Sequence, residues 1–350
     1  MSTLQLDFLE SIYKIQKETS LFGKWIHYNH ISPLLNKLSV KAEVNQIGVS
    51  ENKTPIHSVK IGSGDKKILI WSQMHGNEST GTRALFDLLN TLTNASGEQV
   101  SEILNECTIL AIPMLNPDGS YNYTRVNANN VDLNRDVIAR AAVESNLLRT
   151  VLEDFNPQFC FNLHDQRTIF GVEGTENPAS ISFLAPSEEE TRMLTGGRKE
   201  TMNVIIAMNS LLQKVIPNHI GRYTDEFYPT ATGDNFQKLG YNTILIEAGH
   251  YPNDYEREEV RKFNFFALLK GIHHIAINTE FTNYKEYFNI PNNQENFFDV
   301  IEKDTKESSL GAAYQYIDSV KDGQFISKKT LERKGDLSKY LAHEYVFLKK

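Results

Sequence analysis

The stretch KILIWSQMHGNE, residues 67–78, decides the fold class because it joins a buried strand to a group of polar side chains. Its first part, Lys67–Gln73, is an apolar run of strand length, and His75 and Glu78 follow it closely. Three further apolar runs of this kind lie at Cys107–Leu115, Gln158–Leu163 and Asn242–Ala248. The chain therefore repeats one pattern: a buried strand with polar residues at its carboxyl end.

Segments with helical spacing of apolar residues alternate with these runs. They are Leu4–Ile15, the stripe Ala84–Leu89 behind the candidate caps Ser79 and Thr80, Ala139–Phe155, Met193–Val215 and Glu256–Ile277. Two β-like runs, Ala42–Val49 and His57–Ile61, come before the first buried strand. Buried strands that alternate with helices predict an α/β fold with a mixed, largely parallel central sheet and helices on both faces.

The last 70 residues have a different sequence pattern. Residues 281–350 contain short apolar or aromatic runs, such as Phe297–Ile301 and Ala312–Ile317, separated by polar turns such as Lys321-Asp322-Gly323. We therefore expect a small β-rich appendage there and a larger α/β domain at residues 1–280. The length of 350 residues agrees with roughly two domains. The net charge of −8 lies wholly in residues 1–280, because residues 281–350 hold 11 basic and 11 acidic residues.

Composition excludes several classes of protein. With 40% hydrophobic and 23% charged residues, the chain is typical of a globular protein with a sizeable core. Its negative charge argues against nucleic acids and anionic membranes as partners. No stretch approaches the roughly 18–20 apolar residues of a membrane span, and residues 1–14 lack the features of a secretory signal. We expect a cytoplasmic protein in which Cys107 and Cys160 are buried, reduced thiols.

Two histidines and two glutamates follow the strands in a pattern that suits a metal. His75 and Glu78 come after the first buried strand, His164 ends the third, and Glu247 lies near the end of the last. Ligands bind at the carboxyl ends of strands in such folds, and a catalytic zinc takes three protein ligands from imidazole and carboxylate groups. We expect His75, Glu78 and His164 to hold one zinc ion, with Glu247 free to act as a base. Each residue alone also has an ordinary structural interpretation, although a lone carboxylate in an apolar strand is costly.

The segment NPDGSYNYTRVNANNVDLNRD, residues 116–136, supplies a second group of candidates. Arg125 and Arg135 carry planar guanidinium groups that suit carboxylate recognition, and Asn134 adds a neutral donor. The alternative is a polar loop with solvated arginines.

Taken in order, these landmarks resemble the zinc carboxypeptidases of the M14 type. The landmarks are His-Gly-Asn-Glu after a strand, Asn-Pro-Asp-Gly, Thr-Arg-x-Asn-x-x-x-Val-Asp-Leu-Asn-Arg, a later strand-end histidine and a late strand glutamate. The resemblance spans His75 to Glu247, with flanking helices to about residue 280. It implies that His75, Glu78 and His164 bind zinc and that Glu247 activates the zinc-bound water.

The resemblance also implies roles for the arginine-rich segment. Arg125 would polarise the scissile carbonyl and stabilise the oxyanion, while Asn134 and Arg135 would hold the terminal carboxylate of the substrate. Tyr228, in Tyr-Pro-Thr-Ala-Thr-Gly, resembles the mobile tyrosine that closes over the substrate. Tyr223 is a rival for that role, and a packed aromatic residue is the third interpretation.

Five further residues have open interpretations. Asp136 stands where many family members have Asn, and an extra acid there would alter side-chain preference or the pKa of a neighbour. Asp234 lies in the region of a pocket floor that selects basic side chains. His250 lies at the rim of the cleft or is structural. Asp165 and Asn162 either orient a metal ligand or are ordinary polar residues at a strand end.

The resemblance implies a metallocarboxypeptidase that hydrolyses the C-terminal amide bond of a peptide, cell-wall-derived peptides included. The alternative is a zinc amidohydrolase of the succinylglutamate desuccinylase or aspartoacylase type, which cleaves small N-acyl amino acids and can carry a β-rich appendage like residues 281–350. Asn-Pro-Asp-Gly favours the peptidase. An inactive binding protein is a third hypothesis, which retention of Glu247 disfavours. The expected partner is a peptide or a small carboxylate-bearing amide.

Overall fold

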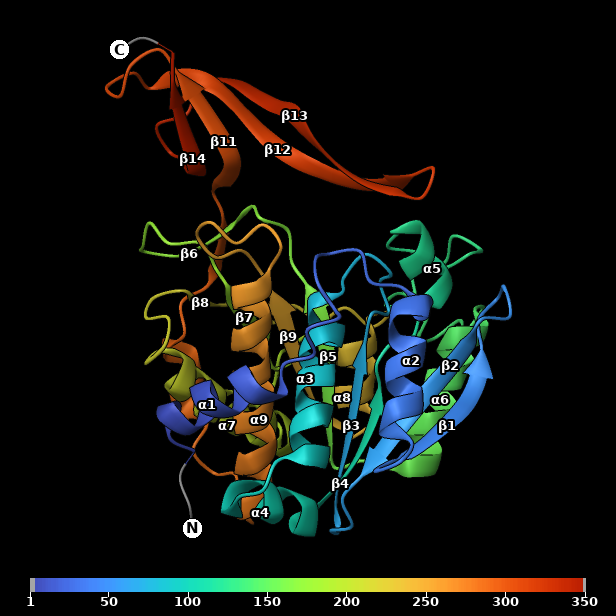
Figure 1. Ribbon diagram of the computed structural model, residues 1–350. Helices are drawn as coiled ribbons and strands as arrows, with labels where there is room; N and C mark the ends of the chain where they lie inside the picture. The colour runs from blue at the N-terminus through green and yellow to red at the C-terminus, as the bar shows by residue number, and fades with distance from the viewer. Residues whose placement is uncertain (1–3, 349–350) are drawn as a thin grey trace.

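The computed structural model describes residues 4–348 and contains two large sheets and one two-stranded sheet (Figure 1). The larger is an eight-stranded mixed sheet with helices on both faces, and a separate four-stranded sheet follows from the C-terminal part of the chain. The α/β class with a β-rich C-terminal region, predicted from the sequence, is confirmed.

The large sheet has the strand order β1-β2-β4-β3-β5-β9-β7-β8. Its strands are β1 (Glu43–Val49), β2 (Pro55–Ile61), β3 (Lys66–Ser72), β4 (Cys107–Ile112), β5 (Phe159–Asp165), β7 (Ile181–Leu184), β8 (Ile220–Arg222) and β9 (Asn242–Ala248). The four central strands β4, β3, β5 and β9 run parallel, whereas β1, β2 and β7 join by antiparallel pairing. The carboxyl ends of β3, β5 and β9 therefore lie side by side at one edge.

Helices cover both faces of this sheet. They are α1 (Leu6–Gln16), α2 (Tyr28–Leu38), α3 (Thr80–Asn94), α4 (Glu98–Glu106), α5 (Pro117–Asn122), α6 (Val143–Phe155), α7 (Gly196–Leu212), α8 (Thr232–Lys238) and α9 (Glu258–Ile277). Apolar residues of α1, α3, α4, α7 and α9 form one core with the sheet, and α6 and α8 form a second core on the other face. In that second core the Trp71 ring meets Phe236 edge-on at 5.5 Å.

A buried ion pair ties α9 to α3. Nε and Nη2 of Arg261 each donate to a carboxylate oxygen of Asp87 at 2.7 Å, and both side chains are fully buried. The same guanidinium donates to the carbonyl oxygens of Leu21 at 2.6 Å and Glu18 at 2.8 Å. It therefore holds the segment after α1 against the two long helices. These hydrogen bonds offset the free-energy cost of removing the guanidinium charge from water.

The helices α2, α4, α5 and α8 were not predicted from the sequence, and α6 begins later than expected. Helix α6 begins at Val143 rather than at Ala139, because the Asp136 carboxylate accepts hydrogen bonds from the backbone amides of Ala141 and Ala142 and holds that segment in a turn. Helix α2 was not predicted, because Pro33 interrupts its helical pattern.

The C-terminal sheet has the order β13-β12-β11-β14 and a small core of Ile301, Ala313 and Leu337. Its strands are β11 (Phe297–Lys303), β12 (Leu310–Lys321), β13 (Gln324–Asp336) and β14 (Leu341–Phe347). The connection to it packs on the larger part: the 3₁₀ helix Lys285–Asn289 buries Tyr287 in the main core, and β10 (Asn293–Glu295) pairs with β6 (Phe170–Val172). The division of the chain at residue 280 stays a prediction.

Two further properties concern the whole described chain. Cys107 and Cys160 are both buried and free, as predicted. Within residues 4–348, no helix combines the length and apolar character that crossing a membrane requires.

Candidate active site

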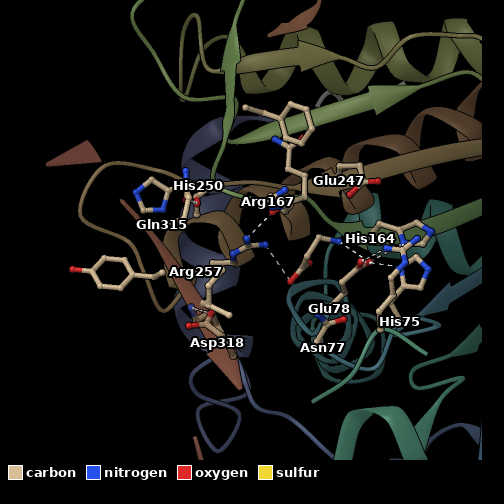
Figure 2. A pocket seen from close by; sticks show the side chains of 18 of the residues that line it. His75, Asn77, Glu78, His164, Arg167, Glu247, His250, Arg257, Gln315 and Asp318 are labelled. Atoms are coloured by element: carbon tan, nitrogen blue, oxygen red, sulfur yellow. Dashed lines mark hydrogen bonds and ion pairs between the residues drawn. The ribbon is translucent and has the colours of Figure 1, made fainter. Parts of the chain in front are cut away.

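Three predicted metal ligands meet at the carboxyl edge of the large sheet. His75 and Glu78 lie in the loop after β3, and His164 lies at the end of β5 (Figure 2). Nδ1 of His75 is 2.8 Å from Oε1 of Glu78, and Nδ1 of His164 is 2.8 Å from Oε2 of Glu78. All three residues are buried, and their potential ligand atoms lie within 4.8 Å of one another.

The donor set fits a zinc ion. The Nδ1 atoms of His75 and His164 lie only 3.1 Å apart with the Glu78 carboxylate against both, so a cation would stabilise this cluster of lone pairs. Two imidazoles and one carboxylate form a donor set that catalytic zinc uses. Burial alone would raise the pKa of Glu78, but the charges of the two histidines lower it well below its usual range. Glu78 is therefore an anion, the state in which a carboxylate can bind a metal.

Two sequence motifs shape the loop that carries the first two ligands. Gly76 lies against the backbone of Gly119, and a Cβ atom on Gly76 would come within 2.0 Å of the Gly119 carbonyl carbon. Asn116 caps α5 by accepting from the Gly119 amide at 2.8 Å, and its Nδ2 donates to the Met74 carbonyl oxygen at 3.1 Å. The Asn-Pro-Asp-Gly motif therefore positions the His-Gly-Asn-Glu loop, and glycine is required at the contact.

Asp132 contacts His75, one of the predicted ligands, and was not among the candidate site residues. Its Oδ1 atom lies 3.1 Å from Nε2 of His75, and its Oδ2 atom accepts from Nε of Arg125 at 2.9 Å. Burial would raise the pKa of Asp132, but the hydrogen bond and charge of His75 and the charge of Arg125 lower it below its usual range. Carboxylate–histidine pairs of this kind fix the ring of a metal ligand. The residue lies inside the Val-Asp-Leu-Asn-Arg motif, which was the available signal.

The two residues considered for ligand orientation have other contacts. Asp165 holds Glu78 through its backbone amide, which donates to Oε2 at 3.1 Å, while its carboxylate contacts Thr80 and Arg257. The Asn162 side-chain amide is buried and has no hydrogen-bond partner among residues 4–348.

Arg125, Asn134 and Arg135 line the same cavity as the three ligands. Nη1 of Arg125 lies 3.4 Å from Oε1 of Glu78, and the guanidinium is about half exposed. Asn134 is buried and accepts from the backbone amide of Thr232 at 3.1 Å, while Nη1 of Arg135 donates to the Asn134 carbonyl oxygen at 3.0 Å. The cavity therefore contains cations beside the ligand cluster, in reach of an anionic group.

Glu247 lies directly beside His164, because these two residues pair in register across β9 and β5. Its carboxyl group lines the cavity next to the ligands (Figure 2). Burial, followed by the negative charges of Glu78 and Asp165, raises the pKa of Glu247 well above its ordinary value. A carboxylate with a raised pKa is suited to accept and return a proton near neutral pH.

Of the two candidate tyrosines, the structure brings Tyr223 into the cavity. Burial raises the pKa of Tyr223, and its ring meets Phe170 edge-on at 5.2 Å. Tyr228 lies outside the cavity lining, is 47% exposed, and donates from its hydroxyl to Glu226. The Tyr228 backbone amide donates to Asp234, which holds this loop before α8. A closing role for Tyr228 stays a prediction that requires this loop to move.

The other open positions also have defined places. Asp136 turns the chain before α6 and Asp234 holds the Tyr228 backbone, and neither lines the cavity as it is formed by residues 4–348. His250 is buried in the cavity wall, where its ring lies 3.9 Å from that of His343 in β14. Burial lowers the pKa of His250 to about 2, so it is a neutral wall residue.

The cavity has a volume of about 500 Å³, and the C-terminal sheet forms part of its wall. Its lining includes Asp299 of β11 and the four consecutive β12 residues Gln315, Tyr316, Ile317 and Asp318. Sequence reasoning treated residues 281–350 separately and missed them, because nothing local marks which strand of an appendage will reach a distant site.

Comparison with known proteins agrees with this geometry. The sequence model of the zinc carboxypeptidase family matches residues 28–243. Carboxypeptidase SOL1 of Arabidopsis thaliana is 29% identical over 168 residues, which cover 42% of this chain and 34% of that protein. Probable carboxypeptidase 2 of Trichophyton verrucosum is 31% identical over 102 residues, or 29% of this chain and 20% of that protein. These matches therefore span about a fifth to a third of the length of the curated relatives.

The fold is also that of solved carboxypeptidases. A metallo-carboxypeptidase from Burkholderia cenocepacia superposes with a TM-score of 0.58 at 18% identity, covering 72% of this chain and 70% of that chain. The predicted resemblance is confirmed by the family match, which extends over more than half of the 350 residues. The chain belongs to the zinc carboxypeptidase family.

Proposed function

We propose that this protein is a zinc metallocarboxypeptidase that removes the C-terminal residue of a peptide. The observation that carries the proposal is the meeting of His75, Glu78 and His164, with their ligand atoms within 4.8 Å, in a cavity that Glu247 and Arg125 also line. A zinc ion held there would act as a Lewis acid and lower the pKa of a water molecule that it binds.

The protein side chains supply the remaining chemistry. Glu247 accepts the proton of the attacking water and returns it to the leaving amine. Arg125, held by Asp132, faces the negative charge that develops on the carbonyl oxygen in the transition state. Asn134 and Arg135 bind the terminal carboxylate, and that contact selects the last amide bond of the chain for cleavage. Tyr223 or, after movement of its loop, Tyr228 closes over the bound residue.

A substrate panel tests the proposed activity. We expect the zinc-loaded protein to release the C-terminal amino acid from peptides and cell-wall-derived peptides with a free carboxylate, as measured by mass spectrometry. Cleavage of N-acyl amino acids without cleavage of any peptide would replace this function by the deacylase alternative.

Metal analysis tests the ligand set separately. His75→Ala and His164→Ala are each expected to lower bound zinc at least about tenfold, because two protein ligands remain. The exposed His30 offers the matched control, His30→Ala, which is expected to keep its zinc. Undiminished zinc in both ligand variants would exclude this site.

A further inference from the structure

We propose that the C-terminal sheet is a roof over the active site and restricts the enzyme to short peptides, an inference that rests on the function proposed above. The roof hairpin is β12 with β13, Leu310–Asp336, joined by the turn at Asp322-Gly323. Figure 1 shows this hairpin extending across the carboxyl edge of the large sheet, from above β6 toward α5.

The roof hairpin forms one wall of the catalytic cavity. Gln315 and Asp318 line the same volume as the metal ligands, and Figure 2 shows them on the opposite side of the cavity from His75. Because β12 residues and the ligand cluster line one partly open cavity, a substrate at the metal would lie beneath the hairpin.

The base of the roof is fixed to the loop after β5. Thr168 donates from its hydroxyl to Oε1 of Gln315 at 3.0 Å, and Nε2 of His343 lies 2.8 Å from the Thr168 carbonyl oxygen. The His343 ring also packs on His250, and Tyr316 meets Tyr255 edge-on at 5.3 Å. These contacts join β12 and β14 to the cavity wall.

The outer end of the roof is fixed on the other side. The Phe325 ring meets Tyr123, the residue that directly follows α5, edge-on at 5.1 Å. Lys24 forms an ion pair with Asp318, and the ammonium group lies 5.5 Å from the centre of the Phe325 ring. The hairpin is therefore held at both ends and lies across the cavity.

The volume of this partly open cavity bears on the size of the substrate. About 500 Å³ lies within the range of roughly 300–1,000 Å³ for pockets that enclose most of a drug-sized ligand, which corresponds to a peptide of a few residues. With the terminal carboxylate at Asn134 and Arg135, a long chain would have to pass the roof at Tyr316 and Asp318. We therefore assign short peptides as the substrate class, and long or folded polypeptides are excluded.

A ladder of peptides tests the inference. Peptides of three to ten residues share one C-terminal sequence, and we expect kcat/KM to fall about tenfold or more from the tripeptide to the decapeptide. Equal kcat/KM for all peptides of the ladder would contradict the inference that the roof restricts substrate length, while leaving the carboxypeptidase activity in place.

Two variants open the roof. One deletes Tyr316–Lys321 and Gln324–Lys329 and retains the Asp322-Gly323 turn, so that Gln315 still pairs with Thr330 in the native register. The other, Phe325→Ser, removes the contact with Tyr123, and Ile326→Ser on the exposed side of the same strand is its matched control. We expect both opening variants to reduce the difference between decapeptide and tripeptide, and the control to leave it unchanged.

A binding measurement separates this inference from the activity itself. Calorimetry with zinc-loaded Glu247→Gln gives the Kd of each peptide without turnover. A Kd that is at least about tenfold higher for the decapeptide than for the tripeptide supports the roof, even if no peptide is hydrolysed. Equal Kd values for both peptides, or a preference that persists in both opening variants, would contradict it.

Discussion

Nε2 of His75 lies 3.1 Å from Oδ1 of Asp132, and this contact determines which ring nitrogen of His75 faces the ligand cluster. The opposite nitrogen, Nδ1, is left to approach Glu78 at 2.8 Å. The other oxygen of Asp132 holds Arg125, so one carboxylate contacts both a proposed metal ligand and the proposed oxyanion-binding arginine.

Replacing Asp132 tests that relationship. Asp132→Asn is expected to weaken zinc binding by about 10–100-fold, because the His75 ring loses its charged partner. Competition with a zinc chelator measures the affinity. Asp154→Asn, on the exposed side of α6, is the control and should bind zinc like the unmodified protein. Equal zinc affinity in Asp132→Asn would show that this contact does not support the metal.

Glu247→Gln separates catalysis from metal binding. We expect kcat to fall by about 10²–10⁴-fold, because the amide cannot accept the proton of the attacking water. Zinc content should be unchanged, since Glu247 is outside the proposed ligand set. Peptide hydrolysis followed together with metal analysis checks both points, with the exposed Glu153→Gln as control. Loss of zinc along with activity would make Glu247 a ligand instead.

Arg135→Met tests the proposed carboxylate site. Loss of a charged hydrogen bond worth about 1.5–3 kcal/mol should raise KM for peptides with a free carboxylate by roughly 10–150-fold. The Kd of the corresponding amidated peptides should barely change, since they lack the charged partner. Arg149→Met, which removes an arginine on α6, is the matched control. An equal loss of affinity for free and amidated peptides would place the carboxylate contact elsewhere.

Asp234 predicts a pH dependence of stability. Burial raises its pKa from 3.8 to about 6, so the folded state binds this proton more tightly than the unfolded state. Its contribution to the free energy of unfolding is complete below about pH 4 and is lost as the pH rises through 6, by at most about 3 kcal/mol. Urea unfolding of metal-free protein and Asp234→Asn measures the difference. If the free energies of unfolding of the two proteins changed in parallel between pH 4 and 7, the raised pKa of Asp234 would be contradicted.

The buried pair of Arg261 and Asp87 predicts a large effect on stability. Arg261→Met leaves the Asp87 carboxylate buried without its partner and is expected to reduce the free energy of unfolding by about 3–5 kcal/mol. Lys262→Met, at the next position on α9, removes a more exposed cation and should cost much less. Urea unfolding measures the free energy of unfolding of both variants. Equal losses in the two would show that the buried ion pair does not contribute more to stability than the exposed cation.

Local patterns carried much of the prediction. The strand at Lys67–Gln73 and the helix after Thr80 were visible because apolar spacing is set by the faces that each element buries. His75, Glu78 and His164 could be grouped because parallel neighbouring strands end at the same edge of a sheet, whatever their distance in sequence.

Other features depend on contacts that no local pattern encodes. Asp132 partners His75 across 57 positions, and Gln315 reaches Thr168 across 147. Helix α2 contains Pro33, which opposes helix formation locally, yet its apolar residues Ile31 and Leu35 are buried in the main core. Tertiary packing overrides local preference there. The choice between Tyr223 and Tyr228 likewise depends on loop placement, which spacing alone does not determine.

A single reaction mixture tests whether the protein removes the C-terminal residue of a peptide with a free carboxylate. Zinc-loaded protein is incubated with equal amounts of a tripeptide and its C-terminally amidated form, and the products are identified by mass spectrometry. We expect release of the C-terminal amino acid from the free peptide, with the amidated peptide largely intact and no release after Glu247→Gln. Equal consumption of both peptides, or cleavage at a different bond, would contradict it.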